Sequence, residues 1–191
     1  MSVMEWPHRF LTLDDWAELP ETPEFHVEVV EGVLAVSPRP LSLHQRAINR
    51  LTYWLEEQLP AGYSALHEVE IVIDETPLTV RVPDVIVVAT ELVEANPPRY
   101  DARAVRVAIE VLSEGSRRTD RVTKFSEYAE AGIEHYWIVD IDPPTSMITY
   151  RLIEEDYEDF GEQSGHAELE FDGTPLKFDL NALTTPRAQR L

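Results

Sequence analysis

The stretch Val105-Arg106-Val107-Ala108-Ile109-Glu110-Val111-Leu112 decides the fold, because every position except Arg106 and Glu110 is apolar. An apolar run of this length predicts a β-strand that is buried on both faces. Glu110 is a candidate functional residue, because a carboxylate buried in a strand needs a cation, a hydrogen-bond donor or a raised pKa. A metal ion and a buried arginine are equally good partners at this stage.

Strands and helices on both sides of this run predict an α/β fold, with one mixed β-sheet core flanked by helices. Helices are expected from Thr12 to about Leu19, from Ser42 to about Leu59 and from about Thr119 to Ala131. Strands are expected at His26–Val30, Val33–Ser37, Tyr63–Ile73, Leu78–Val82, Val85–Ala89, Val105–Leu112, His135–Val139, Met147–Leu152, Asp156–Glu162, Leu169–Phe171 and Leu176–Phe178. We predict a single domain over residues 1–191, with its core at about 24–178, peripheral ends and a frayed stretch over residues 184–191.

The composition is that of a globular protein, with 43% hydrophobic and 27% charged residues. The absence of cysteine excludes disulfides, thiolate metal sites and cysteine nucleophiles. No segment approaches the roughly 20 apolar residues that span a membrane. The first seven residues, Met1–Pro7, have an acid where a signal peptide has bases, and they lack an apolar run. We therefore expect a cytoplasmic protein.

The formal net charge of −20 argues against sequence-blind attraction to nucleic acid, because like charges repel. The charge is uneven, however. Residues 99–124 hold seven bases and four acids, a balance of +3, so the remaining chain carries −23. This basic stretch indicates either a place where an anion binds or a helix surface rich in arginine, and the two interpretations have equal weight.

Asp84 stands in Arg81-Val82-Pro83-Asp84, just before the β-branched run Val85–Val88. Proline has no N–H to donate, so the chain is expected to bend or to lie at a sheet edge here. The carboxylate would then face a cleft at the strand end. On this feature alone, an aspartate that caps a turn is the stronger interpretation.

Asp120 and Lys124 are four residues apart and share one face of the predicted helix. A surface ion pair there would contribute only a few tenths of a kcal/mol. The chain has 14 arginines but only two lysines, Lys124 and Lys177. A lysine kept at this position indicates that a compact ammonium group is required.

Two weaker candidates complete the set. Glu28 lies in the middle of a predicted strand among valines, and His44 begins the long helix. A lone histidine is more often structural than catalytic. The sequence has no glycine-rich phosphate loop, no His-Glu-x-x-His zinc motif and no serine-nucleophile elbow.

Together these pieces resemble the Uma-type putative restriction endonuclease family, a branch of the PD-(D/E)XK nuclease superfamily. The resemblance runs from about Glu24 to Phe178. It rests on the order and spacing of short motifs: Glu28 with Glu31-Gly32 and Ser37-Pro38, His44, Val82-Pro83-Asp84, Glu110-Val111-Leu112-Ser113, Asp120 with Lys124, Tyr128 with Gly132, and Tyr136-Trp137-Ile138-Val139-Asp140.

The resemblance implies a restriction-endonuclease-like core and metal-dependent cleavage of DNA. Asp84 and Glu110 would bind Mg²⁺ or Mn²⁺ through carboxylate oxygens. In the superfamily pattern, a lysine stands two residues after the second acid, but this chain has Leu112 at that position. The Uma-type family has its lysine on the following helix, which corresponds to Lys124. Glu28 would be a further acid of the site, and the main-chain carbonyl of Val111 a further metal ligand.

We therefore expect a Mg²⁺-dependent endodeoxyribonuclease-like hydrolase in which Lys124 positions the attacking water or helps to deprotonate it, and Glu28 assists. His44 and Asp120 are candidate additions to the site. Arg117, Arg118 and Arg121 would contact DNA phosphates, although the net charge disfavours DNA. Duplex cleavage would favour a homodimer, because each site cuts one strand. The alternatives are an inactive nuclease fold that binds proteins and a phosphohydrolase of small nucleotides.

Overall fold

A six-stranded sheet surrounds the decisive strand. The computed structural model describes residues 9–20, 25–113 and 115–186. The sheet order is β11-β10-β9-β8-β6-β3, and β8 lies between the parallel strand β9 and the antiparallel strand β6. The bounds are β3 Tyr63–His67, β6 Val85–Ala89, β8 Val105–Val111, β9 His135–Asp140, β10 Ser146–Ile153 and β11 Asp156–Ser164. The prediction of a buried central strand is confirmed.

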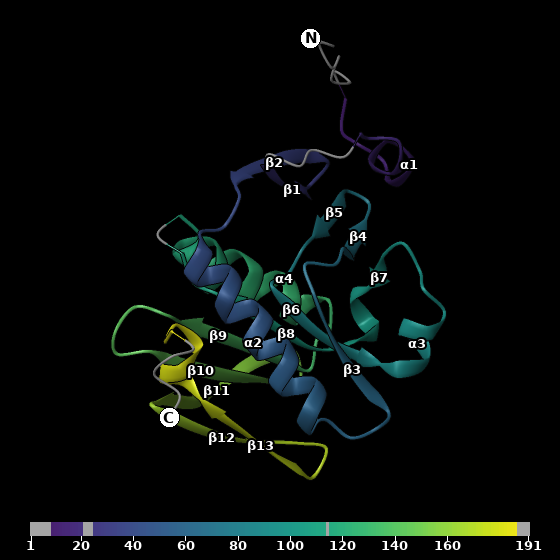
Figure 1. Ribbon diagram of the computed structural model, residues 1–191. Helices are drawn as coiled ribbons and strands as arrows, with labels where there is room; N and C mark the ends of the chain where they lie inside the picture. Colours follow the sequence, from purple (N-terminus) through teal and green to yellow (C-terminus); the bar gives the residue numbers. More distant parts are fainter. Residues whose placement is uncertain (1–8, 21–24, 114, 187–191) are drawn as a thin grey trace.

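Helix α2 (Ser42–Gln58) covers one face of this sheet, together with the hairpin of β12 (His166–Phe171) and β13 (Thr174–Asp179) (Figure 1). Apolar residues of α2 recur at helical spacing and pack on the sheet: Ala47, Ile48, Leu51 and Leu55. A 3₁₀ helix, Leu180–Leu183, follows β13 and accepts hydrogen bonds from Arg50 of α2. This side of the sheet is closed by apolar packing.

The other face of the sheet is covered by α4 (Lys124–Glu130), which follows a π-helical turn at Thr119–Thr123. The aromatic rings of Phe125 and Tyr128 pack here against rings from β9, β10 and β11. The helix predicted over 119–131 is confirmed in extent, but its first turn is wider than an α-helical turn. This widening matters for the site.

A second, five-stranded sheet has the order β2-β1-β5-β4-β7 and lies above the first in Figure 1. Its strands are β1 Phe25–Val30, β2 Val33–Pro38, β4 Ile71–Glu75, β5 Leu78–Arg81 and β7 Tyr100–Asp101. The predicted hairpin of β1 and β2 is confirmed. Glu31 and Gly32 both have positive φ, as a tight two-residue hairpin turn requires. A side chain at Gly32 would also meet Phe10, whose Cβ would lie 2.6 Å from an added Cβ.

Two predictions about elements were wrong, and two short helices were not predicted. The single strand expected over 63–73 is two strands, β3 and β4, in different sheets. Glu68 breaks it with a φ of 51°, and its N–H donates to the Asp84 carbonyl. Helix α3 (Thr90–Glu94) and the 3₁₀ helix Ala102–Ala104 were not predicted. The predicted short helix that starts after Thr12 is α1 (Leu13–Ala17). The strands also form three sheets rather than one.

Both ends extend past the described part of the chain. The predictions for residues 1–8, and for residues 187–191 of the expected frayed end, lie outside the described residues, as do Glu24 and Glu114. Within the described ranges, no helix is both long and apolar enough to cross a membrane. The predicted extent of the domain stays a prediction.

Candidate functional site

Glu110 points to the α4 side of the sheet because side chains alternate along a strand. Its neighbours on that face, Ala108 and Leu112, belong to the cluster under α4, whereas Ile109 and Val111 belong to the cluster under α2. Glu110 is only 3% exposed. Its Oε1 atom accepts hydrogen bonds from Lys124 Nζ at 2.9 Å and from the Tyr128 hydroxyl at 2.8 Å. The predicted buried carboxylate is therefore satisfied by donors from α4.

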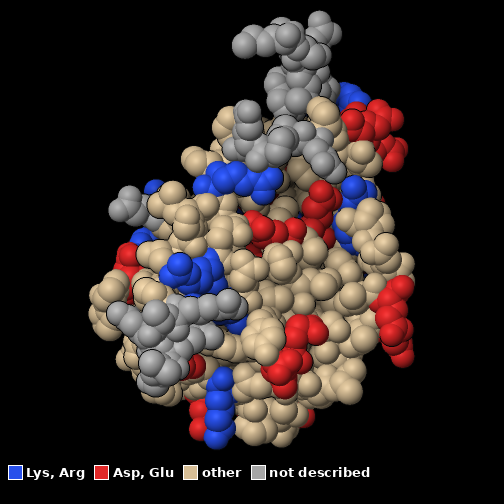
Figure 2. Space-filling view, viewed as in Figure 1, with Lys and Arg blue, Asp and Glu red and all other residues tan. Residues whose placement is uncertain are grey.

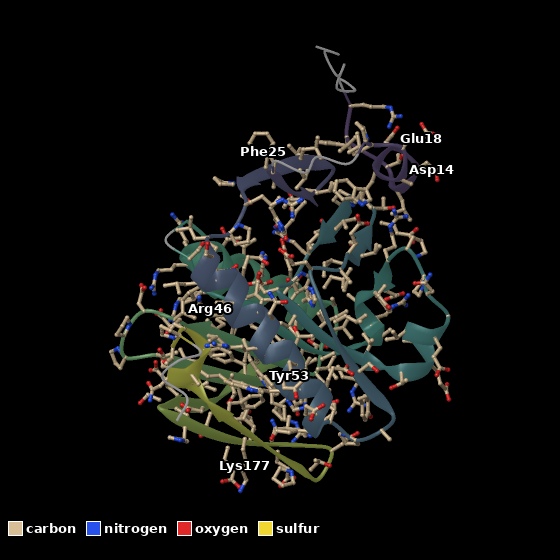
Figure 3. The ribbon with its side chains drawn as sticks, viewed as in Figure 1. Asp14, Glu18, Phe25, Arg46, Tyr53 and Lys177 are labelled. Atoms are coloured by element: carbon tan, nitrogen blue, oxygen red, sulfur yellow. The ribbon has the colours of Figure 1, made fainter. Side chains whose placement is uncertain are left out.

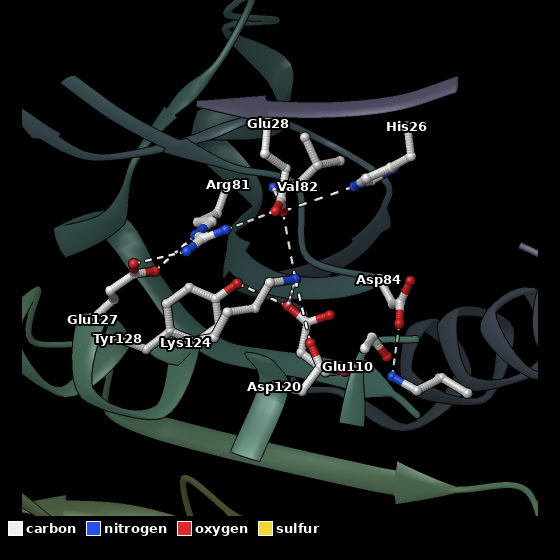
Figure 4. A network of polar contacts seen from close by, with 12 residues as sticks. His26, Glu28, Arg81, Val82, Asp84, Glu110, Asp120, Lys124, Glu127 and Tyr128 are labelled. Atoms are coloured by element: carbon white, nitrogen blue, oxygen red, sulfur yellow. Dashed lines mark hydrogen bonds and ion pairs between the residues drawn. The ribbon is translucent and has the colours of Figure 1, made fainter. Parts of the chain in front are cut away.

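Lys124 lies among three carboxylates (Figure 4). Besides Glu110, its Nζ atom is 3.4 Å from Glu28 Oε1 and 3.6 Å from Asp120 Oδ1. Burial favours loss of the Lys124 proton, but the charges of Glu110, Glu28 and Asp120 outweigh burial and raise the pKa of the lysine. These charges favour the ammonium form of Lys124, which donates hydrogen bonds.

The π-helical turn explains how Asp120 and Lys124 both reach this position. The N–H of Lys124 donates to the Thr119 carbonyl, five residues back, so the turn holds one residue more than an α-helical register. Asp120 and Lys124 are buried, whereas Arg121, Val122 and Thr123 between them are exposed. Turns of this kind occur often at functional sites.

Arg81 ties the five-stranded sheet to the site. Its side chain is 2% exposed; Nη1 donates to Glu28 Oε2 at 2.8 Å, and Nε donates to Glu127 Oε2 at 2.7 Å. The Val82 N–H also donates to Glu28 Oε1. Burial would raise the pKa of Glu28, but Lys124, His26, Arg81 and the Val82 N–H together lower it well below its usual range. Glu28 is therefore an ionised carboxylate held from both sides.

Asp84 lies beside Glu110 at the end of the β6–β8 ladder. The register pairs Val85 with Ile109, so the next position on each strand places Asp84 opposite Glu110. The Val111 N–H donates to Asp84 Oδ2 at 2.7 Å. His44 Nε2, from the first turn of α2, lies 2.6 Å from the Val111 carbonyl and 3.4 Å from Asp84 Oδ2. Two acids at facing positions of an antiparallel pair destabilise it unless a positive charge lies between them.

Negative charge exceeds positive charge at this point. Burial raises the pKa of Glu110 well above its usual range, and the Asp120 and Asp84 charges add to this effect against the opposing charge of Lys124. Burial likewise raises the pKa of Asp120, and Asp84 and Glu28 add to it. Within the described ranges, both carboxylate oxygens of Asp120 are buried and lack a hydrogen-bond partner. The site would be stabilised by an added cation.

A divalent cation fits the donor chemistry of the site. The oxygen donors are the carboxylates of Asp84 and Glu110 and the Val111 carbonyl, the hard ligands that Mg²⁺ and Mn²⁺ prefer. No ready-made group of three His, Asp or Glu side chains is found among the residues that the structure describes. The Val111 N–H and Lys124 each donate a hydrogen bond to one oxygen of the two acids, Asp84 and Glu110. Glu110, Asp120 and Lys124 are nearly buried, whereas Asp84 is partly exposed, and the expected cleft stays a prediction.

The structure brings most of the predicted residues together. Glu28, Glu110, Asp120 and Lys124 form one network, and Asp84 and His44 join it through Val111. The arginines differ from one another. Arg117 is paired with Asp140 and Asp142, whereas Arg118, just before the π-helical turn, and Arg121, within it, are exposed.

Sequence reasoning missed four members of the network: His26, Arg81, Glu127 and Tyr128. Arg81 ends the apolar stretch Leu78-Thr79-Val80, and a charge at the end of a buried strand was the available signal. Tyr128 lies four residues after Lys124, on the same helix face. Its partner, Glu110, is distant in sequence, so no local pattern indicates the contact.

Comparison with known proteins identifies the family of the chain. The model of the Uma2 family, described as "Putative restriction endonuclease", matches residues 13–182. The chain belongs to this family. Among solved structures, the Uma2 chain is similar to a protein from Anabaena variabilis whose title is "putative nuclease belonging to DUF820". The two share 21% identity over 84% of this chain and 89% of the other, with a TM-score of 0.67. No curated protein matches the chain.

These findings confirm the predicted family and the restriction-endonuclease-like α/β fold. The family description supports a nuclease, and the solved structure supports the fold. Restriction-endonuclease-like families generally use a divalent metal.

Proposed function

We propose that this chain is a nuclease that hydrolyses DNA phosphodiester bonds with the help of Mg²⁺ or Mn²⁺. The observation that carries the proposal is the placement of Asp84 opposite Glu110, beside a buried ammonium group. Asp84 and Glu110 would hold the cation, and the Val111 carbonyl would be a further donor. Lys124 and Tyr128 both donate to Glu110 Oε1, so Oε2 is the oxygen that would face the cation.

A bound divalent cation lowers the pKa of its water ligand and offsets charge on the phosphate. Lys124 would orient the attacking water by donating a hydrogen bond to it. The raised pKa of Lys124 argues against its acting as the base. Glu28 and Asp120 would hold the ammonium in place, and Arg81 would in turn hold Glu28.

Calorimetric titration with Mg²⁺ and Mn²⁺ tests the metal site. We expect the wild type to bind the cation and the Asp84→Ala and Glu110→Ala variants to lose binding. Glu158→Ala removes an exposed acid from β11 and is the matched control, with unchanged binding expected. Absence of metal binding by the wild type would contradict the proposal.

Cleavage of labelled DNA tests the reaction itself. Asp84→Ala, Glu110→Ala and Lys124→Ala are each expected to remove cleavage of both single-stranded and duplex substrates. Cleavage that survives all three substitutions would show that the reaction occurs elsewhere. Duplex cleavage would also predict a homodimer, which sedimentation of the intact chain can measure.

A second candidate, hydrolysis of small nucleotides, is favoured by one observation. The head groups of Glu110 and Lys124 are 3% and 6% exposed, which suits a substrate smaller than a duplex. Metal binding without cleavage of any DNA, together with release of phosphate from nucleotides, would support this alternative.

A further inference from the structure

Most arginines in the described part of the chain are neutralised by nearby acids. Seven of them have a carboxylate within ion-pair distance: Arg9, Arg81, Arg99, Arg103, Arg106, Arg117 and Arg151. In a chain with a net charge of −20, such pairs leave little positive potential for an anionic ligand.

Three arginines differ from these seven. Among the described residues, no carboxylate lies within ion-pair distance of Arg46, Arg118 or Arg121. Arg46 donates to the neutral main-chain carbonyl of Thr184 at 2.9 Å, so its charge is not cancelled. Arg118 and Arg121 are exposed. We call these three residues the arginine rim.

The arginine rim lies on two elements that meet at the candidate site. His44, in the first turn of α2, contacts the Val111 carbonyl at the end of β8, and Arg46 follows two residues later. Arg118 and Arg121 stand on either side of Asp120, whose Oδ1 atom lies 3.6 Å from Lys124 Nζ in the candidate site. Figure 3 labels Arg46 on the front of α2, and Figure 2 shows basic side chains around the start of this helix.

The surrounding sequence also lacks negative charge. No acid occurs between Glu31 and Glu56, a stretch that contains Arg39, Arg46 and Arg50 and most of α2. This is a local exception in an acidic chain. An anionic polymer that approached the site along the start of α2 would therefore meet less repulsion than it would along other routes.

We propose that the arginine rim binds the backbone of single-stranded DNA and leads it to the site of Asp84 and Glu110; the inference rests on the function proposed above. Three cations without a carboxylate at ion-pair distance match the few phosphates of a short strand, and Asp140 interacts with Arg121 only at longer range. A flexible strand can also bend toward head groups that are almost buried. A stiff duplex would bring its second strand against the acidic remainder of the surface.

Fluorescence anisotropy of a labelled 12-nucleotide strand, in EDTA, tests this proposal without requiring cleavage. Three phosphate contacts on a single strand give an expected slope of log affinity against log salt of about −2. The triple variant Arg46→Gln, Arg118→Gln, Arg121→Gln should bind at least tenfold more weakly at low salt, with a slope near zero. Glutamine at position 46 keeps a donor for the Thr184 carbonyl, so loss of charge is separated from loss of that contact.

The matched control is the triple variant Arg9→Gln, Arg103→Gln, Arg151→Gln, which changes the net charge equally at arginines that are already paired. It should retain affinity within about twofold. Arg46→Lys should restore the binding that Arg46→Gln loses. Equal losses in both triple variants, or tighter binding of a 12-base-pair duplex than of the strand, would overturn the proposal. Because Asp84→Ala should abolish cleavage yet retain strand binding, failure of the metal site and failure of the arginine rim are distinguishable.

Discussion

The two faces of β8 are built from one apolar stretch, yet they differ in chemistry. On the α2 side, Val107, Ile109 and Val111 pack into an apolar cluster. On the α4 side, Glu110 takes the place between Ala108 and Leu112 and meets Lys124. The apolar face stabilises the fold through burial alone and needs no partner for a charge. The polar face is stable only while every charge keeps its partner.

This difference supports the proposed site on the α4 face of the sheet. A charge kept inside a sheet reduces stability unless it is fully paired, and well-packed apolar groups would do as well or better. Retention of Glu28, Glu110, Asp120 and Lys124 in one buried cluster is therefore better explained by chemistry than by stability. The comparison between the two faces can be tested by substitutions on each.

Lys124→Met should have the largest effect on stability. It leaves Glu110 and Asp120 buried without their cation, so the free energy of unfolding should fall by about 3–5 kcal/mol. Urea denaturation at pH 8 measures this change. The control is Lys177→Met, which removes the exposed partner of Glu168 and should change stability by less than about 0.5 kcal/mol. Equal effects of the two substitutions would remove the distinction between the faces.

Ile109→Ala tests the apolar face. Removal of a fully buried side chain leaves a cavity, and we expect a loss of about 2–5 kcal/mol. Ile109→Val, which removes one methylene group, should lose about 0.5–1.5 kcal/mol. Calorimetry should find metal affinity retained in both folded variants. A loss of metal binding in Ile109→Val, with the fold intact, would show that the two faces are not independent.

Glu110→Gln tests the pH dependence of the polar face. The pKa of Glu110 is raised in the folded state, so its contribution to stability is complete below the usual carboxyl range and is lost as pH rises through the raised pKa. The free energy of unfolding should therefore decrease between about pH 5 and pH 8, and the variant should reduce this decrease. Asp120 and His44 have raised pKa values too, so part of the slope should remain.

The matched control for this slope is Glu158→Gln on the exposed side of β11. Its denaturation midpoints should follow those of the wild type at every pH. An unchanged slope in Glu110→Gln would mean that this carboxyl does not titrate in that range.

Tyr128→Phe should have the smallest effect. It removes the hydroxyl that donates to Glu110 but keeps the ring in its aromatic cluster, so the expected loss is about 0.5–1.5 kcal/mol. Tyr157→Phe is a suitable comparison, because its buried hydroxyl donates to the Ile133 carbonyl, away from the site. Only Tyr128→Phe should alter metal affinity, measured by calorimetry.

Local sequence patterns predicted much of the fold. The apolar run of β8, the helical spacing in α2 and the Glu31-Gly32 turn each depend on neighbours in the chain, and each was predicted correctly. The break at Glu68 was not, because its positive φ is stabilised by a contact with Asp84, which is distant in sequence. Patterns along the chain do not contain such contacts.

The residues of the candidate site also fall into two groups, those that the sequence indicated and those that it did not. Glu110 is conspicuous because it interrupts an apolar strand, and Lys124 because lysine is rare in this chain. The role of Arg81 depends on Glu28 and Glu127, which lie on a strand and a helix far away in sequence. The near-complete burial of the head groups is likewise a property of packing. The roles of Asp84, Glu110 and Lys124 in metal binding and catalysis stay predictions.

The π-helical turn at Thr119–Thr123 affects how related chains should be aligned. An α-helix advances about 100° per residue, so a four-residue interval normally fixes the angle between two side chains. The wider turn breaks this rule between Arg117, which meets Asp140, and Tyr128, which meets Glu110. A relative with one residue fewer in this turn would have a regular α-helix here. In that helix, the side chains at the positions of Arg117 and Tyr128 would point in directions rotated relative to each other, compared with this chain. A single-residue gap in this turn therefore corresponds to a change in the direction of the side chains that follow it. Alignments of related chains should place a gap in this turn rather than move the residue aligned with Lys124.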